Sequence, residues 1–388
     1  MENKDYNRLL VIIPDALSEI ISKGELTERY YNPGNLFKNV DLLLSNNDNF
    51  PSESINLLFG NAKYTINNMP NTGKLFFRTL GYREKLIKKW VSKIFPGIDN
   101  KIPDLIRCYG VDINIIIAYE LKIKYGIPYI ISLHTCPDEN PSVSYASFYN
   151  KIKNKLLSPM IRSAFESADA VLPVYKAIMP YAKRMGAKNI KVLYNVINGK
   201  YLKKKEKYEL HNPIRLLSVG RKIPGKNPEN IIRALKYLPD CNLTIIGGGT
   251  LHEYSIKIAI EEGVDKRITF IQSMNNGNLC EILPDFDMFI SHSDFLEIPK
   301  AVLEPLLTGL PVIINKHYPT PVPEYNSHFI HYSENTPESY SESVKKLAED
   351  SEYREMLGKN AYVFSNENWN PVKTEAKYVE MYKEIMDK

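Results

Sequence analysis

The stretch LLSVGRKIPGKNPENIIRALKYL, residues 216–238, decides the fold. An apolar run ends at Val219, and a helical pattern begins at Asn227 and Pro228. The loop between them holds two glycines and two cations: Gly220, Arg221, Gly225 and Lys226. A strand, a glycine-containing loop and a helix N-terminus favour binding of an anion, and the two cations can add charge-assisted hydrogen bonds. The stretch therefore predicts a Rossmann-like unit that binds a diphosphate, with a solvated basic loop as the plain alternative.

The same loop comes close to a second phosphate-binding motif. Gly220, Gly225 and Lys226 fit the spacing GxxxxGK, but Asn227 stands where a Ser or Thr hydroxyl should bind magnesium. An acidic metal residue at the end of a neighbouring strand would also be needed, and Asp294 is the candidate. A P-loop-like NTPase is therefore kept as a weaker alternative.

Apolar runs of strand length alternate with helical periodicity on both sides of this stretch. The runs are RLLVIIP, DLLLS and PYIISLH before it, and CNLTIIG, RITFIQ, FDMFISH and LPVIIN after it. This alternation predicts parallel sheets covered by helices. We expect an N-terminal Rossmann-like domain over residues 1–198, a C-terminal Rossmann-like domain over 199–370, and a helix over 371–388 that returns to the first domain.

Length and composition agree with two domains in one globular chain. The chain has 388 residues, 44% of them hydrophobic and 24% charged, with a net charge of +5. Its first apolar run is too short for a signal or a membrane span, so a cytoplasmic location is expected. The four cysteines are far apart in the sequence and predict neither disulfides nor a zinc site.

The excess of basic residues lies in the first half of the chain. Residues 73–95, GKLFFRTLGYREKLIKKWVSKIF, are expected to form a basic amphipathic helix. Two interpretations stay open: a surface helix packed on the first domain, or a peripheral contact with the inner face of a membrane. Nucleic acid is disfavoured as a partner, because few aromatic residues accompany the lysines.

A second stretch with chemistry is SHSDFLEIPKAVLEPLLTGLPVII, residues 291–314. It predicts an apolar helix that ends at Gly309 and is followed by a strand. Glu304 should lie in the first turns of this helix, where its carboxylate could accept hydrogen bonds from ribose hydroxyls of a nucleotide. The alternative is an exposed glutamate with a structural role.

Four segments together resemble the donor domain of glycosyltransferase family 4. They are Gly220–Arg221, Lys226, IIGGGT at 245–250 and IPKAVLEPLLTGLPVI at 298–313. The resemblance implies the GT-B fold, two Rossmann-like domains with parallel sheets facing across a cleft. It also implies that Arg221 and Lys226 bind the donor diphosphate and that Glu304 binds the ribose. Gly220, Gly249 and Ala301 are expected to line the same substrate site.

The pattern departs from the family at one position. Two glutamates separated by seven residues are usual, yet Leu296 stands where the first is expected and Glu297 follows it. The family's first glutamate helps to hold the donor sugar. Either Glu297 takes that role through a shift of one residue, or the sugar is held differently.

Segments of the first half are similar to the same family. These are KGELTERYYNPGNLF at 23–37 and GIPYIISLHTCPDENPS at 126–142. They place Gly24 and Glu25 near the donor and make His134, at the end of a strand, resemble the family's active-site histidine. A structural histidine is the alternative on the residues alone.

The resemblance implies a retaining hexosyltransferase that uses a nucleotide-diphosphate sugar, with a UDP-sugar as the expected donor. The acceptor is a glycan, a lipid-linked sugar or a small molecule, within surface polysaccharide biosynthesis. No cofactor and no metal are expected, since Arg221 and Lys226 supply the positive charge and the DFD at 285–287 opens a strand. The alternatives are a nucleotide-sugar epimerase or hydrolase and a non-catalytic nucleotide-sugar-binding protein of the same fold.

Overall fold

The computed structural model describes residues 6–68, 102–139 and 148–388, together with Thr79, Arg83, Lys85, Leu86, Lys88 and Lys89. The helix expected over residues 73–95 lies largely outside the described residues. The chain forms two compact units. The first comprises Met1–Ser22, Leu26–Val196 and Thr374–Lys388, and the second comprises Lys23–Glu25 and Ile197–Lys373.

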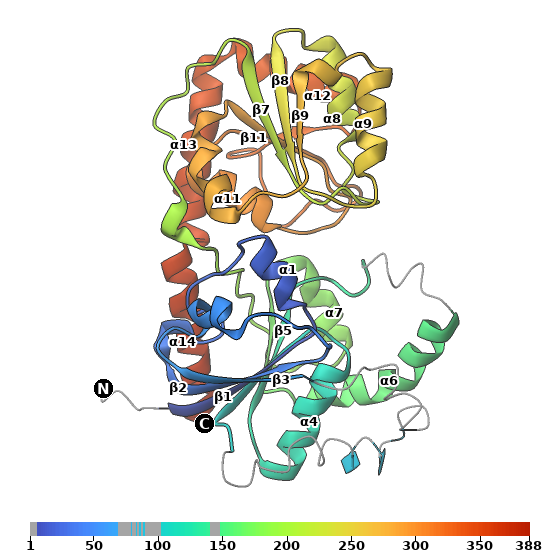
Figure 1. Ribbon diagram of the computed structural model, residues 1–388, viewed down its shortest axis with the longest axis vertical. Helices are drawn as coiled ribbons and strands as arrows, with labels where there is room; N and C mark the ends of the chain where they lie inside the picture. The colour runs from blue at the N-terminus through green and yellow to red at the C-terminus, as the bar shows by residue number, and fades with distance from the viewer. Residues whose placement is uncertain are drawn as a thin grey trace. The chain divides into compact units, whose positions relative to one another are not determined.

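The first unit is built on a six-stranded parallel sheet in the order β3-β2-β1-β4-β5-β6 (Figure 1). Its strands are β1 (Tyr6–Ile13), β2 (Phe37–Leu44), β3 (Lys63–Asn68), β4 (Leu105–Tyr109), β5 (Tyr129–Leu133) and β6 (Ala170–Pro173). The helices along the chain are α1 (Leu17–Ser22), α4 (Ile113–Tyr125), α6 (Phe148–Ser167) and α7 (Met179–Arg184). Alternate apolar residues of β1 and β2 belong to one core cluster of this unit. The strands are nearly all apolar because a parallel sheet covered by helices is buried on both faces.

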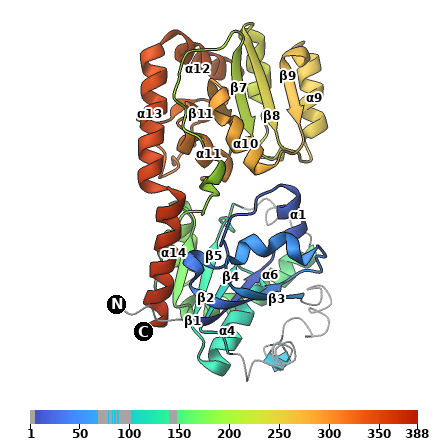
Figure 2. The same cartoon turned by 60° about the vertical axis from the view of Figure 1, so that its left-hand side comes forward.

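The second unit repeats this topology with the order β12-β11-β10-β7-β8-β9, again all parallel (Figure 2). Its strands are β7 (Ile214–Val219), β8 (Cys241–Ile246), β9 (Ile268–Ile271), β10 (Met288–Ser291), β11 (Val312–Asn315) and β12 (His331–Ser333). Its helices are α8 (Glu229–Ala234), α9 (His252–Glu261), α10 (Asn276–Ile282), α11 (Lys300–Thr308), α12 (Pro337–Glu349) and α13 (Ser351–Asn368). The predicted fold class, two Rossmann-like units with parallel sheets, is confirmed.

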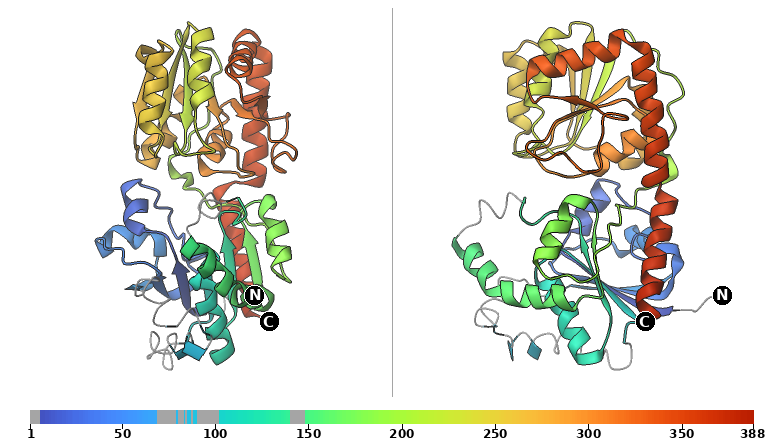
Figure 3. Two further views of the ribbon diagram at one scale, coloured as in Figure 1. Left: turned by 90° about the vertical axis from the view of Figure 1, so that its right-hand side faces the viewer. Right: turned by 180° about the vertical axis from the view of Figure 1, so that it is seen from behind.

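The periodic tail forms helix α14 (Pro371–Met386), which contributes residues to both units (Figure 3). Pro371–Lys373 belong to the second unit and the helix from Thr374 belongs to the first. Within the first unit, Tyr378, Tyr382 and Ile385 are buried in the core, and the Tyr378 hydroxyl donates to the Leu193 carbonyl at 3.0 Å. The helical spacing in the sequence therefore marks a face that packs on the first sheet.

An arginine lies inside strand β4 of the first unit. Arg107 is 2% exposed, and its Nε donates to the Ser132 hydroxyl at 3.0 Å. Its guanidinium lies 4.6 Å from the ring centres of both Tyr109 and Tyr378. Aromatic faces attract a cation, so this stacking offsets part of the cost of burying the charge.

All four cysteines are buried and free, two in each unit. Within the ranges that the structure describes, no helix combines the length and the apolar character needed to cross a membrane.

Candidate functional site

The two loops that the sequence marks as chemical leave neighbouring strands of the second sheet. β7 lies between β8 and β10, so the connection from β7 runs to one side of the sheet and the connection from β10 to the other. Such a switch in strand order opens a crevice at the carboxyl ends of parallel strands, where ligands of doubly wound folds bind. The loops after Val219 and Ser291 both start at this point.

The arginine loop, Gly220–Lys222, is held through its backbone by the end of β8 and by the glycine loop, Gly247–Gly249. The N–H of Gly220 donates to the Ile246 carbonyl at 2.9 Å, and the N–H of Lys222 donates to the Gly248 carbonyl at 2.8 Å. Gly249 has a φ of +140°, and a Cβ there would lie 2.3 Å from the Lys222 carbonyl oxygen. Only glycine fits this approach, which gives the predicted site residue Gly249 a packing role.

Arg221 itself is exposed at the tip of the arginine loop. Within the described ranges its side chain makes no hydrogen bond or ion pair. Its neighbour Lys222 is 1% exposed and donates through Nζ to the Gly247 carbonyl. Burial lowers the pKa of Lys222 to about 8. Lys222 is not among the predicted site residues, although it directly follows Arg221 in the loop after β7.

Lys226 forms an ion pair with Glu297. Both side chains are mostly buried, with 17% and 13% of their surfaces exposed. The Ser293 hydroxyl donates at 3.1 Å to Glu297 Oε1, the same oxygen that contacts Lys226. The structure thus brings together two predicted site residues that are far apart in the sequence.

The acidic loop, His292–Glu297, is docked on the loop that carries Lys226. The N–H of Asp294 donates to the Gly225 carbonyl at 2.7 Å. Gly225 has a φ of +83°, and a Cβ there would lie 2.8 Å from the Phe295 ring. The Lys226 ammonium lies 5.5 Å from the centre of the same ring. The predicted metal residue of an NTPase, Asp294, therefore serves this docking through its backbone.

The end of β11 anchors the acidic loop from the opposite side. Asn315 accepts from the Ser293 N–H and donates to the Ser293 carbonyl, both at 2.9 Å. Burial lowers the pKa of His317, and hydrogen bonds with the backbone of Phe295 and Ser293 oppose that shift. Burial also lowers the pKa of His292, whose Nε2 lies 3.3 Å from Asp294. These contacts hold the loop in one position.

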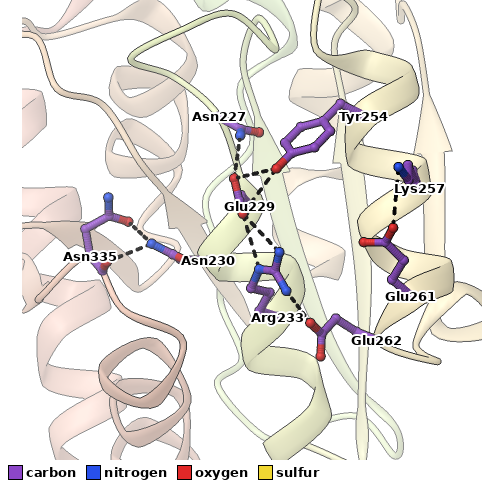
Figure 4. A network of polar contacts seen from close by, with 9 residues as sticks. All are labelled: Asn227, Glu229, Asn230, Arg233, Tyr254, Lys257, Glu261, Glu262 and Asn335. Carbon is purple, nitrogen blue, oxygen red and sulfur yellow. Dashed lines mark hydrogen bonds and ion pairs between the residues drawn. The ribbon is translucent and has the colours of Figure 1, made fainter.

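Helix α8 begins at Glu229 and has six residues, so its dipole is weaker than a long helix would give. Figure 4 shows the polar network that fixes its first turn. Glu229 accepts from the Asn227 amide at 3.2 Å and from Arg233 at 3.1 Å, and Arg233 also pairs with Glu262, which directly follows α9. The Asn230 amide donates to the Asn335 carbonyl at 2.7 Å. Asn227 stands where a P-loop needs a hydroxyl, and its side-chain amide donates to Glu229 instead.

Glu304 lies in the second turn of α11 and is 3% exposed, so the exposed alternative is wrong. The Asn276 amide donates to its Oε1 at 2.8 Å. Burial raises the pKa of Glu304 to about 7, and the bond from Asn276 opposes part of the shift. Ala301 is half-buried on the same helix. A carboxyl group in this state can accept from a further donor such as a hydroxyl.

The predicted residues Gly24 and Glu25 belong with this second unit. The N–H of Asn276 donates to the Lys23 carbonyl at 3.1 Å, and the charge of Glu25 contributes to the raised pKa of Glu304. Gly24 has a φ of +64°, and a Cβ there would lie 2.1 Å from the Asn275 amide. Both residues therefore lie close to the segment that bonds Glu304.

His134 is the predicted site residue that lies in the first unit. It directly follows β5, as the sequence predicts, and it is half-buried. Its ring centre lies 5.1 Å from that of Tyr109 at the end of β4. It therefore occupies the carboxyl edge of the first sheet, where a doubly wound unit presents side chains to a ligand.

The sequence of this chain is similar to those of known glycosyltransferases. Residues 200–364 match the model of the family Glycosyl transferases group 1. The chain is 26% identical over 259 residues to the uncharacterized glycosyltransferase MJ1069 of Methanocaldococcus jannaschii, covering 62% of this chain and 63% of that protein. It is 31% identical over 126 residues to the UDP-Gal:alpha-D-GlcNAc-diphosphoundecaprenol alpha-1,3-galactosyltransferase of Escherichia coli, covering 31% of this chain and 32% of that protein.

Solved structures agree on the architecture. HepE of Anabaena, determined in complex with UDP and glucose, superposes with a TM-score of 0.69 at 14% identity, covering 97% of this chain and 99% of that one. The chain has the GT-B fold, and the matched domain together with this fold supports a glycosyltransferase.

Proposed function

We propose that the chain is a retaining, metal-independent glycosyltransferase that moves a hexose from a UDP-sugar to a glycan acceptor. The observation that carries the proposal is the meeting of the arginine loop, the glycine loop and Lys226 at the switch point of the second sheet. Glu304, buried in the same unit, supplies a carboxyl group for a ribose. HepE, whose fold is similar, was determined with UDP and glucose, which supports a UDP-sugar as the donor.

The chemistry requires that negative charge on the departing diphosphate is stabilised. Arg221 is exposed and free to turn toward an anion, and Lys226 lies in the loop two residues before the N-cap of α8. Fixed positive groups that meet developing charge lower the barrier, without a metal ion in this proposal. The leaving phosphate would accept the acceptor's proton while the acceptor attacks from the same face. His134 is proposed to position the sugar or the acceptor.

A lipid-linked sugar is the acceptor class that we propose, in the synthesis of a surface polysaccharide on the cytoplasmic side of a membrane. The relative from Escherichia coli is named for a diphosphoundecaprenol-linked acceptor. An epimerase or hydrolase would consume the donor without any acceptor, and a binding protein would not consume it at all. Consumption of the donor, measured with and without an acceptor, therefore distinguishes both alternatives from a transferase.

The test is to incubate the purified protein with a panel of nucleotide sugars in the presence of a chelator, recording thermal shift and nucleotide release. Arg221→Ala and Glu304→Gln are compared with wild type and with Lys266→Ala, an exposed cation of the same unit. We expect one donor to bind, with binding lost or weakened at least tenfold in both site variants and kept in the control. If all three variants bind every nucleotide sugar as wild type does, the proposed site is wrong.

Release of nucleotide then separates the reaction classes. A transferase releases UDP faster when a lipid-linked or soluble glycan acceptor is added. Release at the same rate with and without acceptors favours a hydrolase, and conversion of the sugar without release favours an epimerase. Loss of turnover with chelator, restored by Mg²⁺ or Mn²⁺, would contradict metal independence.

A further inference from the structure

Of the two cations expected to meet the donor diphosphate, one already has an anionic partner in the protein. Lys226 is paired with Glu297, and both side chains are largely withdrawn from solvent. We propose that Glu297 is a specificity residue of the donor site, which weakens binding of the free nucleoside diphosphate relative to the nucleotide sugar. This inference rests on the proposed function.

The Glu297 carboxylate is fixed in its place by more than the ion pair. Its Oε1 accepts a hydrogen bond from Ser293 at 3.1 Å, and the backbone of Ser293 is bonded twice to Asn315. The Glu297 N–H donates to the Phe295 carbonyl at 2.8 Å, and the Phe295 ring lies against Gly225. A ligand that approaches Lys226 therefore meets the carboxylate as well, because the loop that carries it is held by the end of β11 and by the loop after β7.

The charge of each ligand decides how strongly the Glu297 carboxylate repels it. Lys226 and Glu297 together have no net charge, so the surplus positive charge at the switch point comes from Arg221 and from Lys222. The diphosphate of a nucleotide sugar carries about two negative charges. The free nucleoside diphosphate carries about one more near neutral pH, because its terminal phosphate has a second ionisation near pH 6.

A fixed carboxylate repels the extra charge of the product more than it repels the donor. At roughly 6 Å in the partly screened surroundings of a protein surface, this difference amounts to a factor of about three to ten in affinity. The Ser293 hydroxyl and the Lys226 ammonium both contact Oε1 of Glu297, so the carboxylate is held in place. The arrangement therefore favours release of the product over release of the donor.

The experiment compares wild type with Glu297→Gln, Glu297→Asp and Glu253→Gln by titration calorimetry. Glu297→Gln removes the charge and keeps the shape, Glu297→Asp keeps the charge, and Glu253 is an exposed acid of the same unit. The probes are UDP with UDP-glucose and GDP with GDP-mannose, at pH 7.5 and at pH 5.5. Thermal unfolding of each variant reports whether the fold is kept.

In Glu297→Gln at pH 7.5 we expect the nucleoside diphosphate to bind about three to ten times more tightly, and the nucleotide sugar to change less than half as much on a logarithmic scale. The gain should shrink at pH 5.5, where the terminal phosphate is largely protonated. Glu297→Asp and Glu253→Gln should keep the wild-type ratio of the two affinities. A role limited to holding Lys226 in position predicts no such pH dependence.

Two results would overturn the inference and leave the proposed function standing. One is an equal change for both ligands in Glu297→Gln, and the other is weaker binding of the nucleoside diphosphate, which would show that Glu297 serves Lys226 as a positioning partner. Failure of wild type to bind any of the four probes would overturn both the inference and the proposed function.

Discussion

The Asn276 side-chain amide donates a 2.8 Å hydrogen bond to the Glu304 carboxyl group, which is otherwise buried in helix α11. An amide is a neutral donor, so it satisfies one oxygen without supplying the positive charge that would keep a buried carboxylate ionised. The pKa of Glu304 is accordingly raised to about 7 by burial. The group can therefore change its protonation state near neutral pH.

Glu304 should make the stability of the protein depend on pH. Its pKa is 4.5 when exposed and about 7 in the folded chain, so the folded state holds the proton more tightly. The contribution is complete below pH 4.5 and is lost as the pH rises through 7, with an upper limit of about 3 kcal/mol. Urea unfolding from pH 5 to 8 should show this decline in wild type and a smaller one in Glu304→Gln. Equal slopes in both proteins would contradict the raised pKa.

Gly249→Ala should destabilise the second unit and displace the arginine loop. A Cβ at this position would lie 2.3 Å from the Lys222 carbonyl oxygen, and the φ of +140° is unfavourable for alanine. We expect a loss of about 2–4 kcal/mol in the free energy of unfolding. Gly263→Ala is the matched control, because Gly263 also has a positive φ, +67°, but no atom lies within 4 Å of the added Cβ. The control should lose about 1 kcal/mol, and an equal loss in both would show that backbone conformation alone is responsible.

Asp287→Asn should destabilise the second unit through the backbone. The Asp287 carboxylate accepts from the Arg215 N–H at 2.7 Å and lies 2.9 Å from the His211 ring nitrogen Nδ1. The residue is 2% exposed, so an amide that cannot accept at both oxygens leaves a buried donor without its partner. Chemical denaturation should show a loss of about 2–3 kcal/mol. The exposed neighbour Asp285→Asn should change stability by less than about 0.5 kcal/mol; a comparable effect there would contradict the assignment.

Lys222→Met should alter stability in alkaline solution. Burial lowers the pKa of Lys222 from 10.5 to about 8, so the unfolded chain binds the proton more tightly. The stability of wild type should therefore rise between pH 8 and 10.5 by about 1–3 kcal/mol as the folded lysine loses its charge. Lys222→Met has no such charge, so the stability of wild type relative to the variant should rise over this range. Guanidinium unfolding at pH 7.5 and at pH 10 measures the free energy of unfolding of both proteins. A difference that is the same at both pH values would show that burial does not lower the pKa of Lys222.

The interior strands could be predicted from the sequence because they are continuous apolar runs. β1, β2, β5, β7, β8, β10 and β11 coincide with such runs, and so does the edge strand β9. β3 was missed, since its residues KYTINN are half or fully exposed at the edge of the sheet. β4 was missed because Arg107 interrupts its apolar run, and the Ser132 hydroxyl and the tyrosine rings that accommodate the charge come from other parts of the fold and from β4 itself. β12 has three residues and too short a pattern to detect.

The candidate site could be predicted in its residues and not in its pairing. The loop after Val219 and the helix carrying Glu304 are local patterns, so both were found where the structure has them. The pairing of Lys226 with Glu297 depends on Gly225, which lets the Phe295 ring approach, and on Asn315 from another strand. Burial of Glu304 likewise depends on α10, which supplies Asn276. Contacts of this kind are set by tertiary packing, so the spacing of residues in the sequence does not predict them.

Burial raises the pKa of each of the four thiols and keeps the reactive thiolate scarce, so we expect the folded chain to react slowly with thiol reagents. Cys108 and Cys136 report on the first unit, while Cys241 and Cys280 report on the second. An alkylating agent followed by peptide mass spectrometry would therefore record, without any engineered label, which unit opens first under heat or denaturant. Two native cysteines in each unit therefore report separately on the unfolding of that unit.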